Sequence, residues 1–386
     1  MIKKYAITRK LKIAFLLLQV FLLFFTKSYS QNLSENAKIS ILTCDAGNEL
    51  YSIYGHTAIR IQDSNQKLDL VYNFGYFDFR TPNFYLKFVK GDLQYFAGMT
   101  SFTDFMNEYV YFQRGVYEQT LNLNQSQRQA ILNDLNSILN SEKRFYTYKF
   151  IDRNCTTMVV DILNKNLNEK INTNIKDNQK TNRKILYDCI TPLFYANLGI
   201  NIVFGVKTDA QFDHIYLPLQ FLEGINLSKN NGKKLCDKTK ILNKQSYAQA
   251  EVSLWDNKYL YFIFFIAIAI FNKSIIRNFY FVLMGCLGIF LIWVGWYSNH
   301  SELQPNFNIA LFNPLYFFLV YFNEKNNRNF ALKTIYLIVI CLLFYTFLML
   351  NKVHLLMFLP IILTNVLLLY RAFLKTKKSA RITPAL

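Results

Sequence analysis

Residues 278–297 read NFYFVLMGCLGIFLIWVGWY, twenty residues without a charged side chain. A run of this length and composition is typical of a helix that spans the hydrocarbon core of a bilayer. Outward from it, further apolar runs occupy 257–272, 308–323, 330–350 and 353–370, of which the first and second are short for a span. The sequence therefore predicts an all-α bundle of about five transmembrane helices over 257–372, followed by a basic cytoplasmic tail at 373–386.

The charges between these runs predict the orientation of the bundle. From position 257 onward the chain has twelve Lys or Arg residues and only two acids. The cations gather at 273–277, at 325–333 and after 370, whereas the alternate connections 298–308 and 351–354 carry one cation, Lys352. Because short cytoplasmic loops are enriched in Lys and Arg, five spans would begin outside and end inside.

The N-terminus has the pattern of an export signal. Basic residues before position 13 precede an apolar stretch over 13–25, and the small-x-small pattern Ser28-Tyr29-Ser30 follows. Residues 1–30 are therefore interpreted as a signal peptide, or as an N-terminal anchor if they are not cleaved. Both interpretations place the next domain outside the cytoplasm, in agreement with the loop charges. We predict a multi-pass protein of the inner membrane with this domain in the periplasm.

Residues 31–227 combine strand-like and helical patterns, which predicts an α+β domain. Branched and aromatic residues favour strands at 39–42, 51–61 and 68–79, and further short strands at 85–99 and 109–123. Apolar residues at helical spacing predict helices over 126–139 and 154–167. The polar stretch 228–256 is predicted to be a linker to the bundle.

Composition limits the partners and cofactors that we expect. The net charge is +18, but many of the cations lie at the membrane flanks, so we expect a membrane surface and no nucleic acid as partner. The six cysteines include no CxxC pair, and no phosphate-binding glycine loop is present, so no metal and no cofactor is expected. In an oxidising compartment Cys44, Cys189 or Cys236 could form disulfides.

A cysteine and a histidine are the candidates for catalysis. Cys155 begins the predicted helix 154–167, where the helix dipole and the unpaired N–H groups favour a thiolate and could hold an oxyanion. His56 lies on the predicted strand 51–61, on the same face as Arg60. A histidine within reach of the thiol would complete a Cys–His pair.

Other side chains are candidates for orienting His56 or for contacting a substrate. Asp69 and Asn73 share a face of the following strand, and we favour Asn73 as the group that orients His56. Arg114 and Arg183 could each hold a phosphate, with a salt bridge as the alternative. The remaining predicted substrate contacts are Tyr54, Asn154 and, in the outward loop 298–308, His300.

The motifs YGHTAIRI at 54–61 and NCTT at 154–157 resemble the circularly permuted NlpC/P60, papain-like group that includes lecithin:retinol acyltransferase. More specifically, the chain resembles the lipoprotein N-acyltransferases of the Bacteroidota type over nearly its whole length. The segments that carry this resemblance are LYSIYGHTAIR at 50–60, YNFGYFDF at 72–79, RGVYEQ at 114–119, NCTT at 154–157, SNH at 298–300, PNFN at 305–308 and NPL at 313–315.

The resemblance implies a permuted papain-like periplasmic domain with Cys155 as nucleophile and His56 as base. It also implies transfer of a fatty acyl chain from a phospholipid to the α-amine of a diacylglyceryl-cysteine lipoprotein, through an acyl-thioester on the cysteine. Many relatives have an acid immediately before the Asn-Cys pair, where this chain has Arg153, with Asp152 one position earlier. Two alternatives stay open, a membrane-anchored NlpC/P60-like peptidase or amidase acting on the cell wall and a non-enzymatic envelope scaffold.

Overall fold

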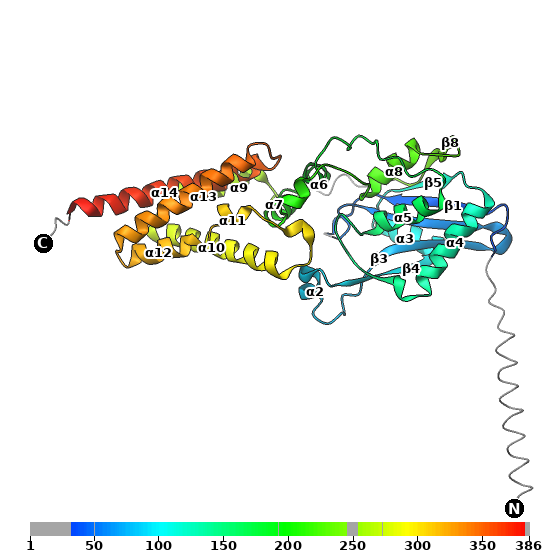
Figure 1. Cartoon of the computed structure of the whole chain (residues 1–386), viewed down its shortest axis with the longest axis horizontal. Coiled ribbons are helices and arrows are strands. Elements are labelled where there is room, and N and C mark those ends of the chain that lie inside the picture. The colour runs from blue at the N-terminus through cyan, green and yellow to red at the C-terminus, as the bar shows by residue number, and fades with distance from the viewer. Residues whose placement is uncertain (1–31, 50, 192, 245–253, 272, 383–386) are drawn as a thin grey trace, which may run out of the picture.

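The computed structural model describes residues 32–49, 51–191, 193–244, 254–271 and 273–382. The chain forms two parts that lie end to end along the long axis of the molecule, a sheet domain and a helical bundle (Figure 1). This arrangement confirms the predicted α+β domain followed by an all-α region. The predicted signal segment, residues 1–30, lies outside the described residues.

A seven-stranded antiparallel sheet forms the centre of the first domain, with the strand order β6-β4-β3-β2-β1-β5-β9. Strand β2 lies in the middle, where Cys44 of β1 is opposite His56 and Asn73 of β3 is opposite Ala58. The strands are β1 (Lys38–Cys44), β2 (His56–Asp63), β3 (Leu68–Tyr76), β4 (Gln94–Ser101), β5 (Val116–Leu121), β6 (Phe145–Thr147) and β9 (Cys236–Asn243).

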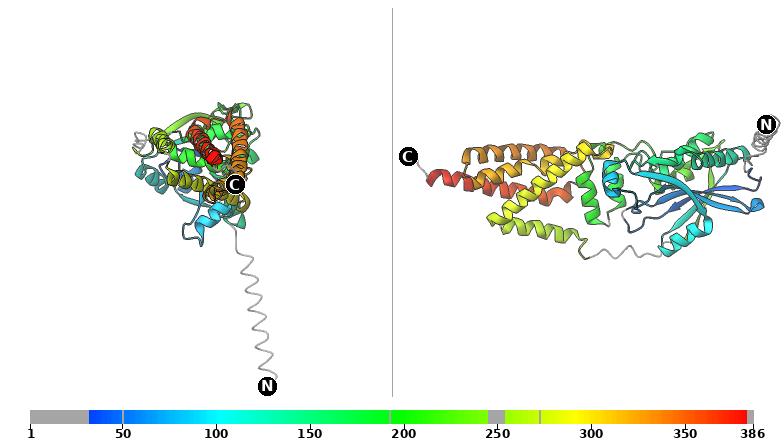
Figure 2. Two further views of the ribbon diagram at one scale, coloured as in Figure 1. Left: turned by 90° about the vertical axis from the view of Figure 1, so that its left-hand side faces the viewer. Right: turned by 90° about the horizontal axis from the view of Figure 1, so that it is seen from below.

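Helices cover both faces of this sheet (Figure 2). Each face has its own apolar core. Because side chains alternate along a strand, Ile39 and Ile41 of β1 belong to one core and Leu42 to the other. Helices α4 (Gln125–Leu139) and α5 (Cys155–Asn166) form where the sequence predicts them and pack on the first core. Helix α3 (Phe102–Tyr111) covers the opposite face with Phe105 and Tyr109.

Two predicted segments differ from the structure. The predicted linker 228–256 contains strand β9, which pairs with β5 at the edge of the sheet. The lysines of β9 are exposed because it is an edge strand, whose polar side chains face solvent. The composition of β9 is therefore similar to that of a linker, which is why the sequence predicted one. The predicted strand region 85–99 begins with a helix, α2 (Phe84–Lys90), which ends at Gly91 in the left-handed conformation. The other predicted domain bounds stay a prediction.

Smaller elements complete the sheet domain, and α6 and α7 lie on its side toward the bundle (Figure 1). They are η1 (Ser64–Gln66), η2 (Glu142–Arg144), α6 (Asn182–Cys189), α7 (Phe194–Val203), η3 (Val206–Asp209), α8 (Pro218–Leu227), β7 (Lys229–Asn230) and β8 (Lys233–Lys234). All six cysteines are free, so none of the disulfides considered from the sequence is formed.

All five predicted apolar runs form helices, but three of them are long and apolar enough to cross a membrane: Ser274–Tyr297, Arg328–Met349 and Leu355–Lys377. Helix α9 has 13 residues and α12 has 10. At 1.5 Å per residue they rise about 20 and 15 Å, against about 30 Å of hydrocarbon. The helix lengths thus support three membrane crossings. Crossing of the membrane by α9 and α12 stays a prediction. The bundle contains α9 (Lys258–Ile270), α10 (Ser274–Tyr297), η4 (Ser301–Leu303), α11 (Asn308–Leu311), α12 (Leu315–Glu324), α13 (Arg328–Met349) and α14 (Leu355–Ile382).

The loop 298–308 fastens the bundle to the sheet domain. Glu302 is fully buried, and its side chain accepts a hydrogen bond from the N–H of Ile151 at 3.1 Å. Its backbone carbonyl accepts another from the N–H of Gly205 at 2.7 Å. In the other connection that was predicted to face outward, Lys352 forms an ion pair with Asp209 at 3.2 Å. Both loops therefore lie on the side of the sheet domain, as the charge pattern predicts.

Candidate active site

His56 and Cys155 meet at one end of the sheet. His56 is the first residue of β2, and Cys155 is the first residue of α5, which packs against β2 and β3. The hydroxyl oxygens of Thr57 and Thr156 lie 3.0 Å apart in a buried hydrogen bond, which fixes the start of the helix to the start of the strand. The thiol and the imidazole lie close enough for each to shift the pKa of the other.

Gly55 makes this approach possible. Its φ angle is +83°, and a Cβ atom there would lie 2.4 Å from the carbonyl oxygen of Cys44. A side chain would both strain the backbone and collide with β1. The chain can therefore turn into β2 and present His56 at the end of the sheet only with glycine at position 55.

The pKa values of the two groups shift in opposite directions. Burial raises the pKa of the Cys155 thiol, but the charge and hydrogen bond of His56, with smaller contributions from Thr57 and Thr156, bring it below its ordinary value. Burial lowers the pKa of His56, but the Cys155 charge and hydrogen bonds from Cys155 and Asn73 raise it above its ordinary value. Both shifts favour a thiolate beside an imidazolium.

Asn73 is the side chain that holds the outer nitrogen of the imidazole. Its Oδ1 lies 3.1 Å from His56 Nε2, and Asn73 is 4% exposed. The alternative, Asp69, instead accepts two hydrogen bonds of 2.7 Å from Arg60. Because Nε2 donates to Asn73 in this arrangement, Nδ1 is left to face the thiol.

Asn154 caps the start of α5, a role that the sequence analysis did not predict. Its Oδ1 accepts from the N–H groups of Thr156 and Thr157 at 2.9 and 3.1 Å, which caps α5. Its Nδ2 donates to the carbonyl oxygens of Phe150 and Tyr216 at 2.9 and 3.0 Å. No donor or acceptor of this side chain is left over for the predicted substrate contact. Two of the first-turn N–H groups predicted to hold an oxyanion are also occupied.

Tyr146 is a residue of the site that the sequence analysis missed. Gly75, at φ +102°, lies next to both Tyr146 and Cys155, because a Cβ atom there would lie 3.9 Å from Cys155 Cβ and 4.0 Å from the Tyr146 hydroxyl. That hydroxyl is buried and has no hydrogen-bond partner among the described residues. No spacing in the sequence connects Tyr146 with Cys155, since it comes from the short edge strand β6.

Arg114 and Tyr54 lie near the pair without presenting a polar group to solvent. Arg114 is 8% exposed, donates from Nε to the carbonyl oxygen of Asp45 at 2.9 Å and stacks over the ring of Tyr109. Its charge opposes the rise in the pKa of His56. The Tyr54 hydroxyl is buried, and burial raises its pKa.

His300 does not join the site. Its Nε2 lies 2.9 Å from the carbonyl oxygen of Phe88, and its ring packs against Gly91 at the end of α2. The imidazole therefore fastens the loop 298–308 to the sheet domain, in place of the predicted contact with lipid head groups.

Aromatic rings connect the vicinity of Cys155 with α2. The ring of Tyr148 stacks on Tyr95, whose ring contacts Phe77, and Phe77 contacts Phe84 at the start of α2. Helix α2 contacts α10, the first long apolar helix of the bundle. Several large side chains along this path are exposed, namely Tyr51, Phe79, Tyr85, Leu86 and Phe88. An apolar surface thus extends from the pair toward the bundle.

Comparison with known families gives two matches that together cover most of the chain. Residues 25–188 match the model of the Lnb N-terminal periplasmic domain, and residues 256–380 match the model of the Lnb transmembrane domain. The first match contains His56, Asn73, Tyr146 and Cys155, and the second contains all of α10, α12 and α13. No curated protein and no solved structure matches the chain.

Proposed function

The chain belongs to the Lnb family and is therefore a membrane enzyme of lipoprotein biogenesis with a periplasmic domain, and from this premise we propose that it is a lipoprotein N-acyltransferase. In the proposed reaction a fatty acyl chain passes from a phospholipid to the α-amine of a diacylglyceryl-cysteine lipoprotein. The observation that carries the proposal is the placement of Cys155 at the start of α5 beside His56 at the start of β2, held by the Thr57–Thr156 hydrogen bond, with Asn73 behind the imidazole.

The first half-reaction forms an acyl-thioester. The Cys155 thiolate attacks the carbonyl carbon of the phospholipid ester, so that an S–C bond forms and the carbonyl oxygen takes the negative charge. When the C–O bond breaks, the leaving alkoxide takes the proton of the His56 imidazolium, and a lysophospholipid departs. Neutral His56 is then ready to act as a base.

The second half-reaction delivers the acyl chain to the lipoprotein. The α-amine attacks the thioester carbonyl and gives a proton to His56 as the C–S bond breaks. The amide is formed, and the thiolate and imidazolium are restored. Since the amide is more stable than the ester that supplied the acyl group, the two steps need no nucleotide.

We propose that Tyr146 stabilises the oxyanion of both tetrahedral intermediates. Its hydroxyl is buried, has no hydrogen-bond partner among the residues that the structure describes, and lies with Cys155 next to Gly75. A preorganised donor in such a place stabilises charge that develops only during the reaction. The backbone N–H of Cys155 is the second donor in this proposal, because those of Thr156 and Thr157 already donate to the Asn154 side chain that caps α5.

The surroundings of the pair favour lipid substrates. The apolar surface from Cys155 toward α2 would receive acyl chains, and the bundle holds the site next to the bilayer. In this proposal Arg114 acts on the site by its charge, while His300 and Asn154 hold the scaffold. The strand histidine preceding the helix cysteine also supports the permuted papain-like arrangement.

An acyl-transfer assay with the full-length protein tests this function. The protein in detergent micelles receives a phospholipid with a labelled acyl chain and a synthetic diacylglyceryl-cysteine peptide. Labelled amide on the peptide is expected from wild type and from Cys189→Ala, a matched control at an exposed cysteine, but not from Cys155→Ala. Cleavage of a muropeptide instead of acyl transfer would mean a wall amidase, and neither reaction would mean an envelope scaffold.

A further inference from the structure

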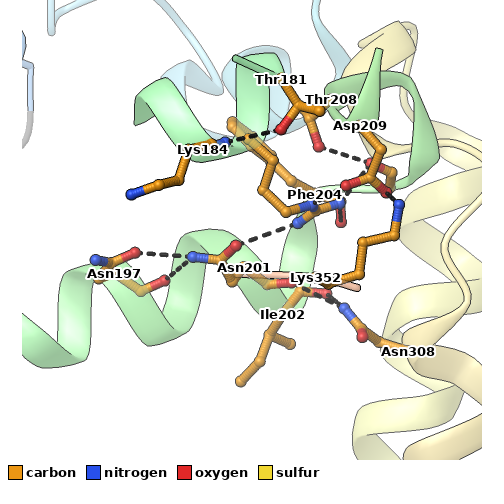
Figure 3. Close-up of polar contacts among 12 residues, drawn as sticks. Thr181, Lys184, Asn197, Asn201, Ile202, Phe204, Thr208, Asp209, Asn308 and Lys352 are labelled. Carbon is orange, nitrogen blue, oxygen red and sulfur yellow. Dashed lines mark hydrogen bonds and ion pairs between the residues drawn. The ribbon is translucent and has the colours of Figure 1, made fainter. Parts of the chain in front are cut away.

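A cavity of about 410 Å³ lies between the sheet domain and the bundle, away from Cys155. One side is formed by Arg183 of α6 and by the segment 204–209, and the other by the end of α13 and the turn before α14. Figure 3 shows the polar contacts around it, where α6, η3 and the bundle come together. Helix α13 ends at the cavity and helix α14 begins there. The cavity therefore lies at the periplasmic end of two candidate membrane spans.

The polar wall of the cavity is connected by hydrogen bonds and carries excess positive charge. Arg183 is 5% exposed and donates to Asp209 Oδ1 at 2.7 Å, to Asn201 Oδ1 at 3.2 Å and to the carbonyl oxygen of Gly205 at 2.7 Å. Asp209 also pairs with Lys352 at 3.2 Å. The charged residues that line the cavity are thus two cations and one anion, a formal charge of +1 with histidine neutral.

Two groups on this wall have hydrogen-bonding capacity to spare. His354 lines the cavity and is 1% exposed, yet its Nδ1 has no partner among the described residues. A buried polar atom of this kind costs free energy unless something binds it. The Lys352 ammonium has three donors, of which Asp209 faces one. Lys352 and His354 both line the cavity and lie two residues apart in the chain.

The opposite wall is apolar, and its large side chains are exposed. Phe347 at the end of α13 is 72% exposed, Leu350 is 65% exposed and Phe307 is 39% exposed, and all three line the cavity. A ligand that satisfies both walls has an anionic acceptor at one end and an acyl chain at the other. A membrane phospholipid has this form, and an anionic head group would be attracted to the cationic wall.

We propose that this cavity binds the phosphate of a membrane phospholipid through Lys352 and His354, with an acyl chain along Phe347 and Leu350. Such a site would hold a lipid beside the sheet domain and fix the height of the domain above the bilayer. The inference does not depend on the proposed function, because the cavity would bind phospholipid whatever reaction Cys155 catalyses.

Calorimetric titration of the full-length Cys155→Ala protein in detergent micelles tests the site without turnover. The probes are short-chain phosphatidylglycerol, the matching diacylglycerol without phosphate, and inorganic phosphate. Phosphatidylglycerol is expected to bind more tightly than either other probe. Lys352→Met should weaken this binding about 10- to 100-fold, the loss of a hydrogen bond to a charged group. Lys352→Arg should keep most of the affinity, and Lys240→Met, an exposed change on β9, should keep all of it.

Three results would overturn the inference. Unchanged affinity in Lys352→Met would exclude this cavity as the phosphate site. Equal binding of the diacylglycerol would mean an apolar groove without phosphate recognition, and equal binding of inorganic phosphate would mean that no lipid is selected. If Lys352→Met proves unfolded by circular dichroism, His354→Gln replaces it in the comparison with the same expected loss.

Discussion

Replacing His56 by alanine should raise the pKa of the Cys155 thiol. In the wild type the charge and hydrogen bond of His56 oppose the effect of burial, which on its own would raise the pKa. A neighbouring opposite charge moves a pKa by about 1 to 3 units, so at neutral pH the thiolate fraction should fall about 10- to 1000-fold. A thiolate of higher pKa is more nucleophilic, which reduces the fall in alkylation rate to about 3- to 30-fold.

The assay is alkylation of Cys155 by iodoacetamide as a function of pH, read on the peptide that contains this cysteine. Because the thiolate is the reactive form, the rate rises as pH increases through the thiol pKa, and the midpoint lies below the ordinary value in wild type. In His56→Ala the midpoint should move to higher pH. His214→Ala is the matched control, because His214 contacts Asp213 and the Ile151 carbonyl and should leave the midpoint unchanged.

A midpoint that stays in place in His56→Ala would refute this account of the thiolate. The same holds for a midpoint that moves to lower pH, since removing a stabilising cation cannot favour the thiolate. A shift of equal size in His214→Ala would mean that the change reports general loosening of the domain.

Three further substitutions separate positioning, catalysis and folding. Asn73→Ala should slow acyl transfer about tenfold, because His56 loses one hydrogen bond. It should also alter the pH profile of acyl transfer, whereas a purely structural role of Asn73 would leave that profile unchanged. Tyr146→Phe should lower kcat about 10²- to 10³-fold with little change in KM, as expected for an oxyanion donor, and an unaltered kcat would remove it from the site. Asn154→Ala should destabilise the protein by about 2 kcal/mol in denaturant unfolding, because α5 loses its cap, and a loss of activity at full stability would instead return Asn154 to a substrate contact.

Local signals in the sequence were sufficient for much of the fold. Helices α4 and α5 could be predicted because their apolar spacing agrees with caps at Asn124 and Asn154. Strand β9 could not, because an exposed edge strand lacks the apolar alternation that identifies a strand. Helix α2 fell within a region predicted as short strands and turns, because its aromatic residues favour strands. Its contacts with the bundle are formed only in the folded protein.

In the candidate site too, residues with a local sequence signal could be predicted, and residues brought together only by the fold could not. The thiol at a helix start and the histidine on a strand could be singled out from the sequence, and even spacing pointed to Asn73 as the partner of His56. Tyr146 could not be found, because its place beside Gly75 depends on the pairing of β6 with β4. The cavity at Arg183 is likewise made of distant segments, and the ion pair of Asp209 with Lys352 has no signature along the chain.

The most direct test of the central claim is the intact mass of the protein after treatment with phospholipid in the absence of an amine acceptor. Wild type should gain the mass of one acyl chain on Cys155, as a thioester that neutral hydroxylamine removes and that a diacylglyceryl-cysteine peptide discharges. Cys155→Ala should gain nothing. Failure to detect the adduct after rapid quenching, under conditions in which the peptide becomes acylated, would contradict the covalent mechanism.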